Sequence, residues 1–446
     1  MARKYFGTDG VRGWVGQFPL TVDFVLKLGN AVGRLLEKQH KEKPCVVIGQ
    51  DTRASCDMLK NAFISGITAA GVNVINLGIV PTPVVAFMVE RLRAQAGVVI
   101  SASHNPYYDN GIKLFSHEGH KLPDAFEMEI ERHIDGEFYY VGNDRFGVVE
   151  NQINQIEPYV SYCREKFAKN MDLTGKKVVL DCANGATFRV AKAVFENLGI
   201  EFTEIASDPD GYNINEDCGA VHTQKLVDTV VKMKADIGIA FDGDGDRLML
   251  VDHSGRVIDG DEILYLLAQA PEIVGSIGGV VGTVMTNLAV EKALAEEEVA
   301  FKRAKVGDRY VMEMMLDNGW CLGGEASGHI INLNFNSTGD GLMAALQVLA
   351  VISQRKASLF DLCRIKKMPQ VMINVPLLRK IDAQDLSLLI EDVTFVEKAM
   401  AADGRVVLRP SGTENLLRVM VEARDDRVAQ KWAHYLVDKV KEKIQE

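Results

Sequence analysis

The sequence lacks the features that define several classes of protein. Its seven cysteines form no Cys-x-x-Cys pair and no spacing with histidine that is typical of a zinc site. Their odd number suits reduced thiols in a cytosol better than a framework of disulfides. The N-terminus has no apolar core of a signal peptide, and no apolar run is long enough to span a bilayer. We therefore expect a cytoplasmic protein without a membrane partner.

Nucleotide-binding loops are absent as well. The chain contains neither the Gly-x4-Gly-Lys-Ser/Thr loop of P-loop kinases nor the Gly-x-Gly-x-x-Gly fingerprint of dinucleotide-binding enzymes. Its 50 basic and 61 acidic residues give a net charge of −11, which argues against nucleic acid as a main partner. At 446 residues, with 47% apolar residues, the chain is an ordinary globular protein that is too long for one core. We expect about three or four domains.

Short apolar runs alternate with amphipathic stretches through most of the chain, which predicts α/β domains with buried strands. The expected strands are residues 45–51, 72–77, 96–100, 176–181, 201–205, 237–241, 278–284, 300–306 and 320–322. The expected helices are residues 54–70, 83–93, 185–198, 223–234 and 338–354. The last part differs, with strands at 371–375, 405–408 and 416–421 and a helix from residue 425 or 426. The predicted domains are residues 1–150, 151–254, 255–368 and 369–446.

Three aspartates at alternate positions lie in a glycine-rich turn, residues 242–247, with the sequence Asp-Gly-Asp-Gly-Asp-Arg. Carboxylates so close together repel one another unless a hard divalent cation lies among them, and oxygen ligands suit magnesium. A calcium loop of the EF-hand type is excluded, because Arg247 and His253 stand where it needs glycine and glutamate. The alternative is a solvated surface turn, but a turn between two apolar strands favours a magnesium site at Asp242, Asp244 and Asp246.

A serine-rich loop, residues 101–106, follows a predicted strand and has the sequence Ser-Ala-Ser-His-Asn-Pro. In open α/β sheets the carboxyl ends of the strands are where ligands bind. No Gly-x-Ser-x-Gly elbow surrounds Ser103, which weakens a serine-hydrolase interpretation. As a phosphoserine, this side chain would bring nearly two negative charges and three oxygens to a magnesium shell. A lone serine is usually only a polar loop residue, so the hypothesis depends on its pairing with the aspartate turn.

Other polar residues suit a sugar phosphate. Residues 323–329 place a carboxylate, a hydroxyl and an imidazole on a glycine-rich loop, which suits sugar hydroxyls, although a solvated turn is the simpler alternative. Residues 409–418 combine arginines and hydroxyls in a turn that suits phosphate, with a capped β-turn as the alternative. Lys113 is a candidate for proton transfer or for pairing with phosphate.

Four motifs in a fixed order, residues 101–106, 242–247, 324–329 and 409–414, resemble those of the α-D-phosphohexomutase superfamily over essentially the whole chain. Residues 4–13, 103–113 and 305–310 are most similar to the bacterial members that act on glucosamine phosphates. The resemblance implies an α/β fold with three mixed α/β domains and a smaller α+β C-terminal phosphate-binding domain around a central cleft. Asn415 stands where the related motif commonly has proline, but no phosphate donor is lost by this change.

The resemblance also implies roles for single residues. Ser103 would carry the phosphoryl group as a phosphoserine and would bind the metal together with Asp242, Asp244 and Asp246. Arg247 would contact the phosphoserine, and Lys113 or His104 would assist proton transfer. The sugar would be bound by Glu325, Ser327 and His329, and the phosphate that is not transferred by Arg409, Ser411, Gly412, Thr413 and Arg418.

The implied reaction is the interconversion of glucosamine 6-phosphate and glucosamine 1-phosphate, which feeds synthesis of UDP-N-acetylglucosamine. The implied cofactors are Mg²⁺ and glucose or glucosamine 1,6-bisphosphate, the bisphosphate being both activator and intermediate. The expected partners are small hexosamine phosphates, and a homodimer is kept open as the assembly. The alternatives are a phosphomannomutase or phosphoglucomutase, a metal-dependent sugar phosphatase, and a sugar-phosphate sensor without catalysis. The sensor is disfavoured because the serine and the aspartates are all present.

Overall fold

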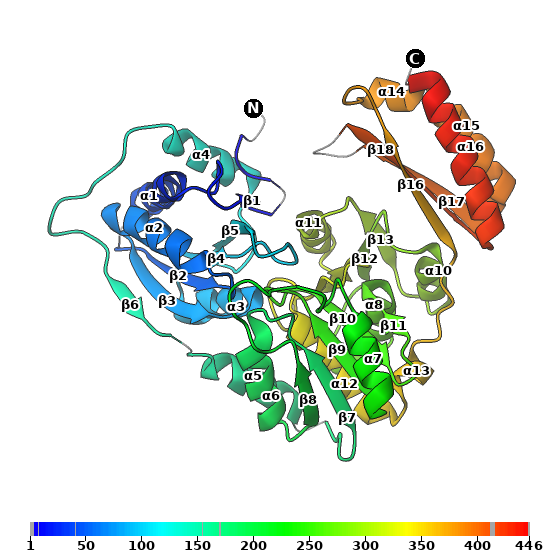
Figure 1. Cartoon of the computed structure of the whole chain (residues 1–446), viewed down its shortest axis with the longest axis horizontal. Helices are drawn as coiled ribbons and strands as arrows, with labels where there is room; N and C mark the ends of the chain where they lie inside the picture. Colours follow the sequence, from blue (N-terminus) through cyan, green and yellow to red (C-terminus); the bar gives the residue numbers. More distant parts are fainter. Residues whose placement is uncertain are drawn as a thin grey trace. The chain divides into compact units, whose positions relative to one another are not determined.

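The computed structural model describes residues 4–7, 9–40, 42–153, 155–168, 171–410 and 415–444. It forms two units, the first made of residues 1–281 and 307–363 and the second of residues 282–306 and 364–446. Figure 1 shows both units as sheets covered by helices. Within the described residues no helix combines the length and the apolar character that a membrane crossing requires.

The first sheet of unit 1 has six strands in the order β1-β5-β4-β2-β3-β6. The pairs among β2, β3, β4 and β6 are parallel, whereas β5 lies antiparallel to both β4 and β1. Apolar residues of this sheet and of the helices α1, α2 and α4 form one core. The bounds are β1 Val11–Trp14, α1 Val22–Gln39, β2 Cys45–Gln50, α2 Cys56–Ala69, β3 Asn73–Ile79, α3 Thr82–Leu92, β4 Ala96–Ile100, β5 Asp109–Ser116, α4 Asp124–Ile134 and β6 Val149–Asn151.

The second sheet of unit 1 has the order β11-β10-β9-β7-β8. Strands β7, β8 and β9 are parallel, and β10 returns antiparallel to β9, so the aspartate turn is the loop of a hairpin. Strand β9 is buried throughout, as its apolar run predicts. The bounds are α5 Glu157–Phe167, β7 Lys177–Asp181, α6 Thr187–Asn197, β8 Glu201–Ile205, α7 Gln224–Met233, β9 Ile237–Phe241, β10 Leu248–Asp252 and β11 Val257–Ile258.

The rest of unit 1 contains strand β14, which pairs parallel with Val280 and Val281 of β12 and antiparallel with β15. The turn between β14 and β15 holds the loop that the sequence assigns to the sugar. Helix α12 is buried over most of its length, which agrees with its nearly continuous apolar run. The bounds are α8 Gly260–Ala268, α9 Pro271–Val274, β12 Val280–Thr283, α11 Asp308–Asn318, β14 Leu322–Gly324, β15 Ile330–Asn332, α12 Gly341–Arg355 and α13 Leu359–Leu362.

Unit 2 contains an antiparallel sheet in the order β16-β18-β17, with α15 and α16 packed against it. Its own apolar core includes Leu417, Val419, Leu436 and Val440. The bounds are α10 Leu288–Glu296, β13 Phe301–Ala304, β16 Gln370–Pro376, α14 Ala383–Ser387, α15 Ile390–Met400, the 3-10 helix Ala401–Asp403, β17 Gly404–Pro410, β18 Leu416–Ala423 and α16 Asp426–Ile444. The expected α/β fold with a smaller antiparallel C-terminal part is confirmed.

Candidate active site

The loop that contains Ser103 leaves the carboxyl end of β4 in a strained conformation. Ser103 is buried and has a φ of +54°, in the left-handed region that residues other than glycine seldom adopt. Its backbone N–H donates to Ser101 Oγ over 2.9 Å, and Ser101 Oγ donates to Asp51 Oδ2 over 2.6 Å. The local strain is therefore balanced by hydrogen bonds that begin at the end of β2.

Two side chains outside this loop hold its carbonyl groups. Arg53 is fully buried, forms an ion pair with Asp51, and donates to the carbonyl oxygens of Ser103, Asn105 and Pro106 over 3.0, 2.8 and 2.8 Å. Asn215 Nδ2 donates to the carbonyls of Ser103 and Asn105 over 3.0 and 3.1 Å. The sequence did not single out either residue. A usable signal was there for Arg53, because it follows β2 at the same edge of the sheet as the serine loop.

The aspartate turn forms a compact group of oxygen ligands. Asp242, Asp244 and Asp246 are buried, and one ligand oxygen of each lies within 4.8 Å of the others. Within the part of the chain that the structure describes, Asp244 Oδ1 and Asp246 Oδ1 are buried without a hydrogen-bond partner. Buried carboxylate oxygens without partners are costly unless a cation or donor meets them. The donor set therefore fits a hard divalent ion.

The serine loop and the aspartate turn meet directly. Ser103 Oγ donates a hydrogen bond to Asp242 Oδ2 over 2.6 Å. The approach is so close that a Cβ on Gly243 would lie 2.6 Å from the Ser103 carbonyl oxygen, so this position requires glycine. Burial, and then the charges of Asp246 and Asp244, raise the pKa of Asp242 to about 7. Arg247 places Nε 3.9 Å from Asp242 Oδ2.

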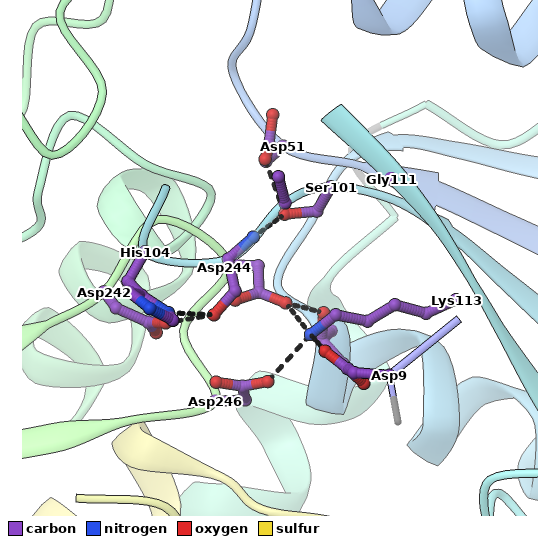
Figure 2. Close-up of polar contacts among 12 residues, drawn as sticks. Asp9, Asp51, Ser101, His104, Gly111, Lys113, Asp242, Asp244 and Asp246 are labelled. Atoms are coloured by element: carbon purple, nitrogen blue, oxygen red, sulfur yellow. Dashed lines mark hydrogen bonds and ion pairs between the residues drawn. The ribbon is translucent and has the colours of Figure 1, made fainter. Parts of the chain in front are cut away.

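Lys113 lies on β5, opposite Val99 of β4, and its side chain is buried among carboxylates. Figure 2 shows its amine between Asp244, Asp246 and Asp9, with Nζ–Oδ2 distances of 2.7, 2.9 and 3.3 Å. Burial alone would lower the pKa of Lys113, but these three negative charges outweigh it and hold the pKa well above its usual value. Lys113 is thus a fixed cation in this arrangement.

His104 differs from Lys113 in its charge. Its Nδ1 lies 3.5 Å from Ser103 Oγ. Burial, together with the positive charges of Arg247 and Arg12, lowers the pKa of His104 to about 4. The imidazole is therefore neutral at pH 7 and is able to accept a proton.

The loop of residues 324–329 presents three polar side chains in different ways. Glu325 Oε1 accepts a hydrogen bond from the Gly307 N–H over 2.9 Å. Ser327 Oγ is buried and has no hydrogen-bond partner among the residues the structure describes. The His329 ring is buried, with Nδ1 3.7 Å from Asp246 Oδ1 and Nε2 3.5 Å from Asp308 Oδ2. His329 therefore contacts the aspartate turn.

The expected phosphate clamp belongs to unit 2. Arg409 lies on β17 directly opposite Arg418 of β18, so the two arginines are cross-strand neighbours. Ser411, Gly412 and Thr413 lie outside the described residues. Two arginines side by side on neighbouring strands repel each other, which suits a place where an anion binds.

Models of one family match nearly the whole chain. The alpha/beta/alpha domains I, II and III of phosphoglucomutase/phosphomannomutase match residues 3–140, 157–255 and 259–368, and the C-terminal domain of that family matches residues 372–439. The chain belongs to the phosphoglucomutase/phosphomannomutase family. It is a mutase, an enzyme of the isomerase class.

This mutase is similar to curated proteins of the family and to solved structures. The phosphoglucosamine mutase of Francisella tularensis subsp. tularensis is 50% identical over 443 residues, which is 99% of each chain. A crystal structure of a family protein from Burkholderia thailandensis superposes with a TM-score of 0.83 at 24% identity, covering 98% of this chain and 97% of that one. The N-acetylphosphoglucosamine mutase of Aspergillus fumigatus, solved with GlcNAc-6P and magnesium, gives a TM-score of 0.68 at 17% identity over 99% and 96% of the chains.

Within unit 1 the mutase brings together most of the residues that the sequence assigned to phosphoryl transfer. Ser103, His104, Lys113, Arg247 and the three aspartates are joined by the contacts described above. The sequence missed Asp9 and Thr82. Asp9 contacts Lys113, Lys121 and Arg12, and Thr82 Oγ1 donates to Asp244 Oδ2. Asp9 lies within residues 4–13 but no ligand pattern marks it, and Thr82 lies in none of the motifs, so the fold reveals their contacts.

Proposed function

We propose that this mutase interconverts glucosamine 6-phosphate and glucosamine 1-phosphate in the cytoplasm, for the synthesis of UDP-N-acetylglucosamine. The observation that carries the proposal is the 2.6 Å hydrogen bond from Ser103 Oγ to Asp242, which puts a buried nucleophile beside a cluster of carboxylates. The choice of glucosamine is supported by the 50% identity to a curated phosphoglucosamine mutase over nearly the whole chain.

We propose that Asp242, Asp244 and Asp246 hold Mg²⁺ together with the phosphate on Ser103. The orphaned oxygens Asp244 Oδ1 and Asp246 Oδ1 support this assignment, because they are buried and able to ligate. When bound, Mg²⁺ would neutralise charge on the phosphoryl oxygens during transfer. Lys113 and Arg247 supply further positive charge at the same place, and neither depends on the ion.

In the forward reaction the phosphoryl group moves from Ser103 to O1 of glucosamine 6-phosphate. The bond from phosphorus to Ser103 Oγ breaks, a bond to O1 forms, and the proton of the O1 hydroxyl must leave. His104 is neutral and lies next to Ser103 Oγ, so it suits transfer of this proton to the departing serine oxygen. Lys113 is held as a cation and suits stabilisation of charge. The product of the step is glucosamine 1,6-bisphosphate.

The second half of the reaction returns the other phosphate to Ser103. The bisphosphate must turn so that its O6 phosphate faces the serine, and a single clamp must then hold either phosphate. The pair Arg409 and Arg418 suits this task. A guanidinium group donates two parallel hydrogen bonds to two oxygens of a phosphate, and this contact does not involve the sugar. Glu325 and Ser327 are proposed to bind sugar hydroxyls, and added glucose or glucosamine 1,6-bisphosphate is expected to activate enzyme that has lost its phosphate.

The test is a comparison of mutase rates on the 1-phosphates of glucosamine, glucose and mannose, with release of inorganic phosphate measured in parallel. We expect glucosamine 1-phosphate to have the largest kcat/KM and phosphate release to be negligible. A larger value for glucose or mannose 1-phosphate would assign the chain to the runner-up specificity. Phosphate release faster than isomerisation would indicate the phosphatase alternative.

A further inference from the structure

The segment Gly307–Asp308–Arg309 begins α11 and has no role in the reaction described so far. Each of its three residues makes a polar contact with a different part of unit 1. Gly307 contacts Glu325, Asp308 contacts His329, and Arg309 contacts the region of α4. Three consecutive residues thus connect the loop of residues 324–329 with the domain that carries Ser103.

Gly307 fixes one end of the sugar-binding loop. Its backbone N–H donates to Glu325 Oε1 over 2.9 Å, which orients the carboxylate proposed to bind sugar hydroxyls. The φ of Gly307 is +125°, a value that favours glycine strongly over residues with a Cβ. The sequence therefore needs glycine here in order to present this N–H to Glu325.

Asp308 lies at the other end of the loop, beside His329. Its Oδ2 lies 3.5 Å from His329 Nε2 and contacts Lys121 Nζ, and Lys121 also contacts Asp9. The side chains of Lys121, Asp308 and His329 are 15%, 15% and 7% exposed. Burial alone would raise the pKa of Asp308, but Lys121 and His329 outweigh it and lower the pKa. Asp308 is therefore a charged neighbour of His329, whose ring lies beside the aspartate turn, although no hydrogen bond joins Asp308 to the ring.

Arg309 anchors the whole segment to the serine domain. Its Nη2 donates to Glu127 Oε1 over 2.7 Å and to the Leu122 carbonyl over 2.8 Å, and Nη1 donates to Glu127 Oε2 over 3.3 Å and to Asp124. The side chains of Arg309 and Glu127 are only 9% and 4% exposed. A buried, two-pronged arginine–carboxylate pair defines a geometry that lysine cannot reproduce.

Close packing does not define the position of this segment on its own. A cavity of about 720 Å³ lies beside it, lined by apolar side chains of α1, β5 and α11 and by Asp308, Arg309 and His329. Where a space of this size separates elements, dispersion contacts fix their relative position weakly. On the side of this cavity the ion pairs and hydrogen bonds of residues 307–309 fix the position, whereas on the side of β14 the buried Val311 and Met315 of α11 pack closely against Gly323.

We propose that Arg309 is a positioning residue which, through Gly307 and Asp308, sets the place of the sugar-binding loop relative to Ser103 and the aspartate turn. This inference rests on the proposed function, because it takes Glu325 as a residue that binds the sugar. Displacement of a binding group by about 1 Å can cost up to about 100-fold in rate, so a small shift of this anchor has a measurable effect.

The experiment compares Arg309→Gln, Arg309→Lys, Glu127→Gln and the double variant Arg309→Gln/Glu127→Gln in the full-length enzyme. The matched control is Arg303→Gln, because Arg303 also forms a two-pronged pair, with Glu291, and also donates to two carbonyls, those of Thr283 and Thr286. The readouts are KM and kcat, the phosphate content of Ser103 by intact mass, and the melting temperature.

We expect Arg309→Gln to raise KM about tenfold, with a smaller fall in kcat and an unchanged phosphate content of Ser103. Arg309→Lys should recover only part of the loss, and the double variant should be no worse than Arg309→Gln, since both changes remove the same contact. The control Arg303→Gln should leave KM within about twofold of wild type.

The idea is wrong if folded Arg309→Gln and Glu127→Gln keep the wild-type KM, or if KM and phosphoserine content change together. Should Arg309→Gln fail to fold, Glu127→Gln and Asp308→Asn decide the question by the same readouts. All variants are assayed on whichever of the three hexose phosphates the wild type converts fastest. An enzyme specific for glucose or mannose would thus contradict the proposed substrate while still testing Arg309, and an enzyme that converts none would contradict both.

Discussion

Ser103 Oγ and Asp242 Oδ2 are 2.6 Å apart, although the two residues are separated by 139 positions in the sequence. They come from the strand ends of two different sheets, β4 in one and β9 in the other. The proposed site for phosphoryl transfer thus lies where the carboxyl ends of strands from two sheets meet. We therefore expect substitutions of the serine, of the aspartates, of the residues that support them and of the proposed clamp to change different measured properties of the enzyme.

Ser103→Ala is expected to abolish turnover and to preserve the fold, because the variant removes the only atom that can carry the phosphoryl group in the proposed cycle. Intact-mass measurement should show a phosphate adduct on the native chain and none on the variant. Ser101→Ala is the matched control, since Ser101 supports the loop through Asp51 and the Ser103 N–H but would carry no phosphate. Full activity in Ser103→Ala would end the phosphoserine hypothesis.

Asp244→Asn should lower turnover by orders of magnitude and weaken magnesium binding, since it removes a ligand charge. Treatment with a chelator should have the same effect on the wild type, and added Mg²⁺ should reverse it. Calorimetric titration with Mg²⁺ measures the loss of affinity separately from activity. Activity that survives exhaustive removal of metal would make the aspartate turn a structural element.

Lys113→Arg and Lys113→Met separate a role as cation from a role as base. Arginine keeps the positive charge but cannot release a proton at any working pH, whereas methionine keeps much of the length without charge. If Lys113 acts as a cation, the arginine variant should retain at least about tenfold more activity than the methionine variant. Equal inactivity of the two folded variants would favour Lys113 as the proton-transfer group. Steady-state kcat is the measurement.

Asn215→Ala should slow phosphoryl transfer without removing any group that touches the substrate. The variant loses the hydrogen bonds that hold the carbonyls of Ser103 and Asn105, so the left-handed backbone at Ser103 is less well supported. Loss of two such bonds should cost about 1 to 3 kcal/mol, which corresponds to a fall in kcat of about 5- to 150-fold. Single-turnover transfer from the phosphorylated enzyme to the sugar tests this, and an unchanged rate would show that Arg53 alone suffices.

Arg409→Ala tests the two orientations of the intermediate, because the clamp must hold the 6-phosphate in one half-reaction and the 1-phosphate in the other. Loss of a charged contact to phosphate should cost about 2 to 3 kcal/mol, or roughly a 30- to 150-fold fall in kcat/KM in both directions. Free bisphosphate should also accumulate, since a weakly held intermediate leaves before it turns. Wild-type efficiency on both monophosphates, with no bisphosphate in solution, would show that Arg409 is not the clamp.

The sequence predicted the parts of the fold that have a strong local pattern. Strands β4, β8 and β9 were predicted at their observed bounds, because each is a short apolar run between polar residues. Strand β6, Val149–Asn151, was missed at the predicted boundary between residues 150 and 151, since its three residues are all exposed and carry no apolar alternation. These residues form a strand because they pair with β3, and this pairing leaves no pattern in the local sequence.

The site was predictable to the same extent. The motifs singled out Ser103 and the three aspartates, which the structure brings together, because a purely structural role seldom requires repeated carboxylates in one turn and a serine at a strand end. The motif assigned His329 to the sugar, whereas the structure places its ring between Asp246 and Asp308; its role in binding the sugar remains a prediction. The supporting residues Asn215 and Asp9 could not be predicted, because such polar residues have no signature apart from the partners that the fold brings to them, whereas the place of Arg53 after β2 was a usable signal.

The ammonium group of Lys113 gives the aspartate turn a counter-charge that is covalently part of the chain. A group of three carboxylates that depended on a dissolved cation alone would be pushed apart whenever that cation dissociated. Because Lys113 is carried on β5 and pairs with both Asp244 and Asp246, part of the negative charge of the turn is compensated without a dissolved ion. We therefore expect removal of the proposed Mg²⁺ to lower the catalytic rate more than it lowers the stability of the fold.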